Sequence, residues 1–400
     1  MTKKIAYLTG EFPRPTDTWI QREIKGLEKA GSPVETFAIR RPKQDPVGEE
    51  QKTFLENTTY VLELCKSFKL ITSHFKYKIT SPINYLKTLK LAFDTKRPGT
   101  RGGLYQFIYF LEAAVLAQEL EKREIEHIHN HFGDASCTVA MLAAKLAKIE
   151  YSFTLHGPGI FYEPHTWRID KKIQLAKFVA CISYFCRSQA AVFTEPEDIS
   201  KLKIIHCGIE TSKLETAKHS DGRQNILFVA RLAELKGLAD LIEATKKITQ
   251  KNTNLKLTII GDGPERERFE KLAATKGLSE IVNFTGYLSQ TEVASYLSET
   301  DVLVLPSYAE GVPVTLMEAL GSQVPVVATQ VGGVSELVED QTNGIIIRPG
   351  DIGQLSEALL TLIQDPELRK QYGLQGQAKV RAEFNSEVEA IKLQKLFQGK

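Results

Sequence analysis

The chain has 400 residues, of which 42% are hydrophobic and 25% are charged, and its formal net charge is +2. This length exceeds one ordinary hydrophobic core and favours two domains of roughly 150–200 residues each. The ordinary proportions exclude disordered, collagen-like and disulfide-scaffold proteins. The balanced charge gives no field that favours nucleic acid, so we expect no nucleic acid among the partners.

Cysteine usage and hydropathy indicate a cytoplasmic protein. The five cysteines are odd in number, and no pair has the two-residue gap of a zinc or redox motif. Reduced thiols are typical of the cytoplasm. The N-terminus alternates with a strand period and does not resemble a signal peptide. The most apolar stretch, 104–120, is interrupted by Glu112, so we expect no transmembrane span.

Apolar runs alternate with helical periodicity along both halves of the chain, which predicts two mostly parallel sheets covered by helices. In the first half we expect helices at 19–30 and 135–148 and strands at 4–9, 34–39, 127–132, 151–156, 178–183 and 203–206. In the second half we expect helices at 238–250, 265–276, 290–298 and 314–320 and strands at 226–230, 255–260, 281–285, 302–306, 326–329 and 344–348.

The polar stretch 210–224 has little apolar periodicity and is interpreted as a linker. It would separate an N-terminal domain, 1–209, from a C-terminal domain, 225–376. A last helix, 377–400, has no strand after it and can pack back on the first domain. The predicted fold class is α/β with two Rossmann-like, doubly wound domains.

Ligands of open α/β sheets bind at the carboxyl ends of strands, so the residues after each predicted strand are candidates for a site. Arg231 and Lys236 are two cations at a strand-to-helix junction, which is typical of a diphosphate site. The turn Gly261-Asp262-Gly263 lets the backbone approach a flat ligand, although turns need glycine anyway. The third glycine of a dinucleotide fingerprint is missing.

The loop and helix at 306–319 give the sharpest pattern. Glu310 follows an apolar strand, and Pro313 suits a first helical position, with Glu318 about one turn further on. The free amides of Val314 and Thr315 would then face an anion. Carboxylates form strong hydrogen bonds to hydroxyl groups, which suits a ribose and a hexose. The alternative is a pair of solvated glutamates that flank a helix start.

Histidines end two strands of the first half. His156 follows one strand, while His129 and His131 are two residues apart on another and point to the same face. That pair could bind a metal, but no third ligand is apparent and no Asp-x-Asp occurs. We therefore expect no metal site, and interpret His129, His131 and Phe132 as lining of an acceptor site.

Taken together in this order, Arg231, Lys236, Gly261-Asp262-Gly263, Glu310 and Glu318 make region 223–385 resemble the C-terminal half of a GT-B glycosyltransferase of family 4. The resemblance implies two Rossmann-like domains that face a central cleft, and a retaining reaction. It also implies that the two cations neutralise the donor diphosphate, and that Glu318 holds the ribose. The turn at Gly261 would border the base.

The same resemblance assigns catalytic roles to His156, Glu310, Arg231 and Lys236, with Glu310 and His156 beside the transferred sugar. The His-x-His-Phe pattern is similar to that of colanic-acid-type and other surface-polysaccharide members. The first loop lacks the paired glycines of many members, so we place Thr18 and Trp19 near the acceptor instead.

The segment 65–111 is basic and rich in aromatic residues. Its single acid is Asp94, and its cations are Lys66, Lys69, Lys76, Lys78, Lys87, Lys90, Lys96, Arg97 and Arg101. Such a segment either lies on an anionic membrane surface or forms a solvated helical face, and the composition does not decide between them.

The resemblance implies a hexosyltransferase that takes its sugar from a UDP- or GDP-linked donor, without a metal or other cofactor. The acceptor would be a lipid-linked sugar or a glycan of polysaccharide or glycolipid biosynthesis, at the inner face of the cell membrane. Three alternatives stay open. They are a sugar-nucleotide epimerase of GT-B build, a disaccharide or glucan synthase with a soluble acceptor, and a non-catalytic nucleotide-binding scaffold.

Overall fold

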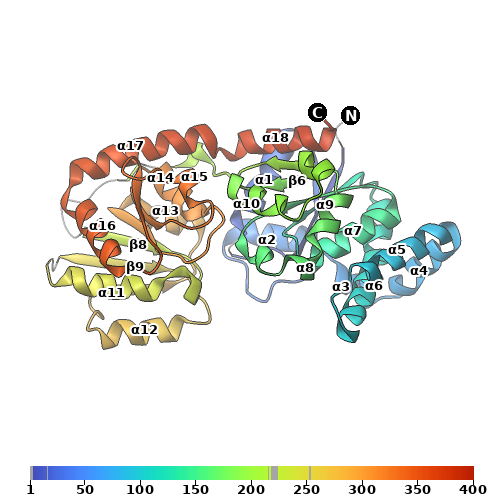
Figure 1. Ribbon diagram of the computed structural model, residues 1–400, viewed down its shortest axis with the longest axis horizontal. Coiled ribbons are helices and arrows are strands. Elements are labelled where there is room, and N and C mark those ends of the chain that lie inside the picture. The colour runs from blue at the N-terminus through green and yellow to red at the C-terminus, as the bar shows by residue number, and fades with distance from the viewer. Residues whose placement is uncertain (1–2, 16, 215, 218–223, 252–253) are drawn as a thin grey trace. The chain divides into compact units, whose positions relative to one another are not determined.

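The computed structural model describes residues 3–15, 17–214, 216–217, 224–251 and 254–400. It divides into two compact units, one of residues 1–206 and 387–400 and the other of residues 207–386. Each unit is an α/β body built around a parallel sheet (Figure 1). None of the helices in the described ranges is both long enough and apolar enough to cross a membrane.

The described part of the first unit holds a parallel sheet of seven strands. In spatial order these are β3 (Thr59–Tyr60), β2 (Val34–Arg40), β1 (Ile5–Glu11), β4 (His127–His131), β5 (Glu150–Leu155), β6 (Val179–Cys181) and β7 (Leu202–Ile204). The order reverses between β1 and β4, because β2 and β3 extend the sheet on one side and β4 begins the other.

The helices of the first unit cover both faces of this sheet. They are α1 (Thr18–Lys29), α2 (Gly48–Asn57), α3 (Val61–Cys65), α4 (Lys69–Thr80), α5 (Pro82–Asp94), α6 (Thr100–Lys122), α7 (Ala135–Ala147), α8 (Pro164–Trp167), α9 (Ile169–Leu175), α10 (Tyr184–Ala191) and α18 (Ser386–Gln398). On one face Ile24 of α1 and Phe397 of α18 join Tyr7 of β1 in a buried core. On the other face α7 packs against β1, β4 and β5.

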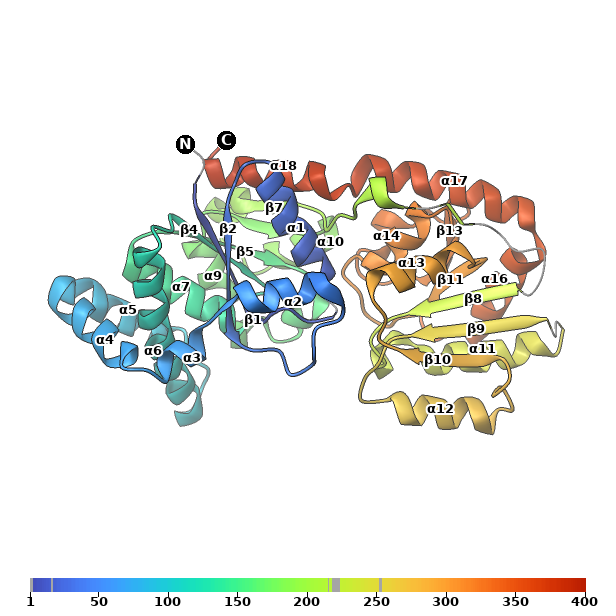
Figure 2. The same ribbon diagram turned by 180° about the vertical axis from the view of Figure 1, so that it is seen from behind.

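The second unit holds, among its described residues, a parallel sheet of six strands. Their order is β10 (Val282–Gly286), β9 (Leu255–Ile260), β8 (Gln224–Val229), β11 (Val302–Leu305), β12 (Val326–Thr329) and β13 (Gly344–Ile347). Its helices are α11 (Leu238–Thr249), α12 (Arg266–Thr275), α13 (Gln290–Ser298), α14 (Val314–Gly321), α15 (Val334–Leu337), α16 (Ile352–Gln364) and α17 (Pro366–Glu383). Figure 2 shows α11 and α12 on one side of β8 and β9, with α14 and α17 on the other.

The strand and helix predictions are confirmed, with small shifts at the element ends. The region between β2 and β4, where no regular apolar pattern is visible in the sequence, consists of β3 and helices α2 to α6. The predicted helix 377–400 is instead the end of α17 followed by α18. The helical run ends before Asn385, which pairs as an isolated bridge with Ile209.

This bridge also sets the division between the units. The backbone N–H of Ile209 donates to Phe384, and that of Ser386 donates to Ile209, at 2.9 and 3.0 Å. Residues 207–209 therefore belong to the second unit, although we expected them at the end of the first domain. The expected linker 210–224 contains a short turn at Thr211–Lys213, while residues 215 and 218–223 lie outside the described residues.

Candidate functional site

The strand order of the second unit brings two loops together at one edge of the sheet. Strands β8 and β11 are direct neighbours, and the chain continues from β8 to β9 on one side and from β11 to β12 on the other. Such a reversal opens a crevice at the carboxyl ends of the strands, where ligands of these folds bind. The loop after β8 carries Arg231 and Lys236, and the loop after β11 carries Glu310.

Lys236 and Glu310 form an ion pair across this reversal. Lys236 Nζ lies 2.5 Å from Glu310 Oε1, and the Ser307 hydroxyl donates to the same oxygen at 2.7 Å. The Glu310 residue is only 8% exposed. Because a buried carboxylate needs compensation, the pair stabilises both loops. The two residues thus meet each other in this structure, whereas the family resemblance implies that they bind different parts of one ligand.

Arg231 differs from Lys236 in having no such partner. It lies two residues after the end of β8 and is exposed, and it makes no hydrogen bond or ion pair with any residue that the structure describes. Lys236 lies in a short 3-10 turn, Glu234–Lys236, just before α11 rather than in the helix itself. Within the described part of the chain, the site therefore offers one free cation, Arg231, and one, Lys236, that is shared with a carboxylate.

The start of α14 lies in the same loop as Glu310. Pro313 is the extended residue before the helix rather than its first helical residue, and no side chain caps this end. Val314, Thr315 and Glu318 are all half-buried. An uncapped helix N-terminus carries a partial positive charge and amide donors, which favours an anion.

Two glycines hold the loops of this site in close contact. Gly261 has a φ of 136°, and a Cβ there would lie 1.9 Å from the Ala230 carbonyl oxygen. Gly332, after β12, has a φ of 52°, and its Cβ would lie 1.8 Å from the Glu310 carbonyl oxygen. Backbone packing alone therefore requires glycine at both positions, whatever ligand binds.

The carboxylate of Asp262 is used within its own turn and helix. It accepts from the N–H of Gly263 at 2.7 Å and pairs with Arg266 at 3.1 Å. The structure therefore brings Arg231, Lys236, Glu310, the Gly261 turn and the start of α14 to one edge of the sheet. It shows no side-chain contact between Asp262 and the Lys236–Glu310 pair.

The first unit has a second cluster at its own strand reversal. His131 Nδ1 lies 2.9 Å from His156 Nε2, and the Trp19 ring lies on His156 with ring centroids 3.9 Å apart. Phe132 also contacts the His156 ring, at 5.0 Å. Burial lowers the pKa of His156 to about 3, so this imidazole is neutral at physiological pH. Thr18 begins α1 next to Trp19 and is half-buried.

Glu23 extends this cluster into the core and was missed from the sequence. Its carboxylate accepts from the Tyr7 hydroxyl at 2.5 Å, and its Oε1 lies 3.4 Å from His131 Nε2. Burial raises the pKa of Glu23 to about 7. A signal existed, because Glu23 lies one helical turn after Trp19 in a predicted helix.

Arg14 is a second residue that sequence reasoning missed. Its guanidinium binds Asp17 through two parallel hydrogen bonds, each 2.9 Å long, and lies over the Phe132 ring at 5.6 Å. The positive charge of Arg14 adds to the burial that lowers the pKa of His156. Because Arg14 follows the first strand, the strand-end rule could have found it.

His129 belongs to the core, which corrects its assignment to an acceptor site. It is fully buried, and its two ring nitrogens lie 2.7 Å from Ser152 Oγ and 2.8 Å from Thr154 Oγ1. Phe397 of α18 covers its ring. Atoms of Glu23, His129 and His131 lie within 4.8 Å of one another, a spacing that could hold a metal ion. With both nitrogens of His129 engaged, the geometry favours a hydrogen-bond network instead.

Comparison with known proteins places these features in a family. Residues 211–379 match the model described as "Glycosyl transferases group 1". An uncharacterized glycosyltransferase of Methanocaldococcus jannaschii is 31% identical over 67% of this chain and 74% of its own length. The amylovoran biosynthesis glycosyltransferase AmsK of Erwinia amylovora is 28% identical over 96% of this chain and 97% of its own. The putative colanic acid biosynthesis glycosyltransferase WcaL of Escherichia coli is 25% identical over 99% and 100%.

Solved structures show the same architecture at lower identity. The sucrose-phosphate synthase of Thermosynechococcus elongatus has a TM-score of 0.75 at 18% identity, covering 99% of both chains. The Anabaena protein HepE, solved in complex with UDP, has a TM-score of 0.73 at 17% identity, covering 99% of this chain and 100% of its own. The two Rossmann-like units are those of the GT-B fold, and the chain belongs to the group 1 glycosyltransferases.

Proposed function

We propose that the protein is a retaining hexosyltransferase of glycosyltransferase family 4. It moves a hexose from a UDP- or GDP-linked donor to a lipid-linked or glycan acceptor in polysaccharide or glycolipid biosynthesis. The observation that carries the proposal is the meeting of Arg231, Lys236, Glu310 and the uncapped start of α14 where the strand order reverses. Relatives named for amylovoran and colanic acid biosynthesis favour the polysaccharide context.

The donor diphosphate binds in the second unit. Arg231 and the amides of Val314 and Thr315 bind its oxygens, and these oxygens compete with Glu310 for Lys236. Glu310 is thereby released to accept from hydroxyls of the transferred sugar, while Glu318 accepts from the ribose and the Gly261–Gly263 turn borders the base. The ion pair of the free protein is in this way exchanged for two ligand contacts.

The reaction depends on charge that develops on the leaving group. As the anomeric bond breaks, negative charge builds on the diphosphate, so Arg231 and Lys236 bind the transition state more tightly than the ground state. These cations and the helix N-terminus supply the neutralisation in this proposal, without a metal or other cofactor. Retention follows a front-face route in which the donor phosphate itself takes the acceptor proton, so no protein base is assigned.

The acceptor binds to the first unit beside Thr18, Trp19 and Phe132, with the neutral His156 next to the reacting sugar. As a neutral imidazole, His156 suits a hydrogen bond to a sugar hydroxyl better than a charge interaction. A lipid-linked acceptor places the enzyme peripherally at the inner face of the cell membrane.

A thermal-shift screen of UDP, GDP, ADP and their sugars tests the donor site. A ligand at 100 times its dissociation constant adds about 2.7 kcal/mol of stability. We expect one nucleotide class to stabilise the wild type, and Arg231→Ala to lose most of that shift. Lys271→Ala, which removes an exposed lysine of α12, is the control and keeps it. If no nucleotide stabilises the protein, or Arg231→Ala responds like the wild type, the proposed site is wrong. Product formed from donor alone would indicate an epimerase.

A further inference from the structure

The helical pair α4 and α5 exposes apolar side chains to solvent. We call six of these residues the apolar face, and each is between 62% and 73% exposed: Phe68, Ile71, Phe75, Ile79, Ile83 and Leu86. Figure 1 shows α4 and α5 side by side at an edge of the first unit, away from its sheet. Leu104 of the neighbouring α6 is 60% exposed as well.

The spacing of these residues follows the helix period. Phe68, Ile71, Phe75 and Ile79 recur every three or four residues, so they form one stripe along α4. Ile83 and Leu86 are three residues apart on α5 and lie on one face of that helix. A stripe of this kind normally faces a core, and here it faces outward.

Polar residues occupy the inward face of the same helices. The Ser73 hydroxyl bonds to Gln118 of α6. His74 Nδ1 lies 2.9 Å from the Tyr85 hydroxyl, and the Tyr77 hydroxyl donates to Glu121 at 2.9 Å. All three inward residues of α4 are buried. Hydrogen bonds therefore hold α4 to the unit, and the apolar face contributes nothing to the core.

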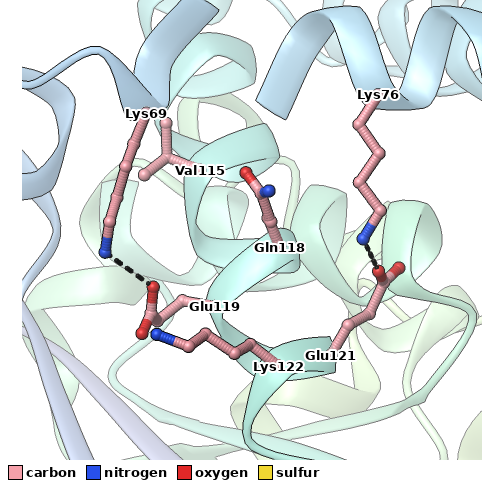
Figure 3. A pocket seen from close by; sticks show the side chains of 7 residues that line it. All are labelled: Lys69, Lys76, Val115, Gln118, Glu119, Glu121 and Lys122. Carbon is pink, nitrogen blue, oxygen red and sulfur yellow. Dashed lines mark hydrogen bonds and ion pairs between the residues drawn. The ribbon is translucent and has the colours of Figure 1, made fainter. Parts of the chain in front are cut away.

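The lysines of α4 and α5 divide into two groups. Lys69 and Lys76 point toward α6, where they pair with Glu119 and Glu121 around a pocket of about 520 Å³ (Figure 3). The basic composition of segment 65–111 suggested that Lys76 is an unpaired surface cation. In the structure it is paired with Glu121.

The second group of lysines borders the apolar face. Lys78 precedes Ile79, Lys87 lies one turn after Ile83, and Lys90 lies one turn after Leu86. All three lysines are exposed and make no ion pair with the residues that the structure describes, although Lys78 Nζ lies 5.8 Å from the centroid of the Tyr85 ring. A large exposed apolar patch marks a binding surface, and a border of exposed cations without a carboxylate partner selects an anionic one.

We infer that the apolar face inserts into the boundary between headgroups and acyl chains of an anionic membrane, with Lys78, Lys87 and Lys90 contacting lipid phosphates. Amphipathic helices with one apolar and one basic side bind in the plane of the membrane interface in this way. The inference goes beyond the proposed sugar transfer and does not depend on it, since vesicle binding can be measured without any donor or acceptor.

Sedimentation of the full chain with lipid vesicles tests the inference. We expect binding to vesicles of equal parts phosphatidylglycerol and phosphatidylcholine, and much weaker binding to phosphatidylcholine alone. The variant with Phe75→Ser, Ile79→Ser and Ile83→Ser should lose at least tenfold in partition. Each of Lys78→Gln, Lys87→Gln and Lys90→Gln should cost about fivefold at low salt, and less at high salt.

Two exposed apolar residues elsewhere in the same unit supply the matched control. Leu175→Ser and Val192→Ser should leave vesicle binding unchanged. Unaltered thermal unfolding of the triple variant would show that it is folded. Phe75→Trp adds a direct probe, because insertion shifts its fluorescence to shorter wavelength when anionic vesicles are added.

Three results would overturn the inference. The first is equal sedimentation of the wild type and the triple serine variant. The second is no sedimentation of the wild type with anionic vesicles. The third is a wild-type dimer in light scattering that the triple variant abolishes, without vesicle binding, which would make the apolar face a contact between two copies of the chain.

Discussion

Lys236 Nζ lies 2.5 Å from Glu310 Oε1, although the two residues are 74 positions apart in the sequence. They meet because β8 and β11 are neighbours, and each residue lies in the loop that follows its strand. The pair keeps a nearly buried carboxylate compensated in the free protein. It also makes the two proposed ligand contacts interdependent, since a diphosphate that takes Lys236 frees Glu310.

The first prediction concerns the stability of this pair. Among the described residues, Lys236→Met leaves the Glu310 carboxylate with only Ser307 as partner, and it should lower the free energy of unfolding by about 1–3 kcal/mol. Adding Glu310→Gln removes the uncompensated charge, so the double variant should regain most of that loss. Urea denaturation followed by circular dichroism measures both. Equal midpoints for the single and double variants would show that the pair has no such role.

A second prediction separates binding from transfer. Glu310→Gln should bind the nucleoside diphosphate at least as tightly as the wild type, because Lys236 loses its competing carboxylate. The rate of sugar transfer should fall about 10²-fold or more, as expected when a hydrogen bond to the transition state is removed. Calorimetry and a transfer assay measure the two effects, with the exposed Glu280→Gln as control. If Glu310→Gln lowers both the affinity for the nucleoside diphosphate and the rate of sugar transfer, the proposed exchange of the Lys236–Glu310 pair for ligand contacts is wrong.

The third prediction concerns the loop contact at Gly332. Gly332→Ala forces a side chain into the left-handed region and places its Cβ against the Glu310 carbonyl, so the loops must separate. We expect a loss of more than about 1 kcal/mol in unfolding free energy, together with weaker nucleotide binding. Gly353→Ala in α16 of the same unit is the control, where alanine meets only the end of the Asp351 side chain. Similar behaviour of the two variants would contradict the close packing.

The fourth prediction uses the pKa of Glu23, which burial raises from 4.5 to about 7. Between these values the folded protein holds a proton that the unfolded chain releases. The free energy of unfolding therefore falls as pH rises through this window, and the deficit remains above it. Glu23→Gln removes the titration and still accepts from Tyr7. It should exceed the wild type in stability at pH 8 by about 3 kcal/mol, and match it below about pH 4.5.

Chemical denaturation of wild type and Glu23→Gln across this pH range provides the test. The described groups that face Glu23 are Tyr7, His129, His131 and, from α18, Glu389, whose charge adds to the raised pKa. All are unchanged in the variant, so their own titrations cancel in the comparison. The exposed Glu56→Gln should show no difference at either end. A stability difference that is constant with pH would refute the buried, protonated carboxyl.

The sequence predicted the sheets well because buried parallel strands read as short apolar runs between amphipathic helices. It also singled out Arg231, Lys236 and Glu310, which directly follow such runs and which the structure brings to one edge of the second sheet. The ion pair between Lys236 and Glu310 could not be predicted, since it depends on which strands are neighbours. Only the strand order, with β11 beside β8, supplies that information.

The errors in the first unit have a different cause. His129 has the same alternation as His131, but Phe397 from the far end of the chain covers it, and a local pattern contains no sign of that contact. The exposure of the apolar side of α4, with its polar side buried, could not be predicted for a similar reason. Composition showed apolar and basic residues together, but which of them face water is set by the packing of α4 on α6.

The most direct test of the central claim is a crystal structure of the full chain with a bound nucleoside diphosphate sugar. We predict diphosphate oxygens within hydrogen-bonding distance of Arg231, Lys236 Nζ and the first amides of α14, and Glu310 turned from the lysine to a sugar hydroxyl. A diphosphate bound away from the β8–β11 reversal, with the Lys236–Glu310 pair intact, would contradict it.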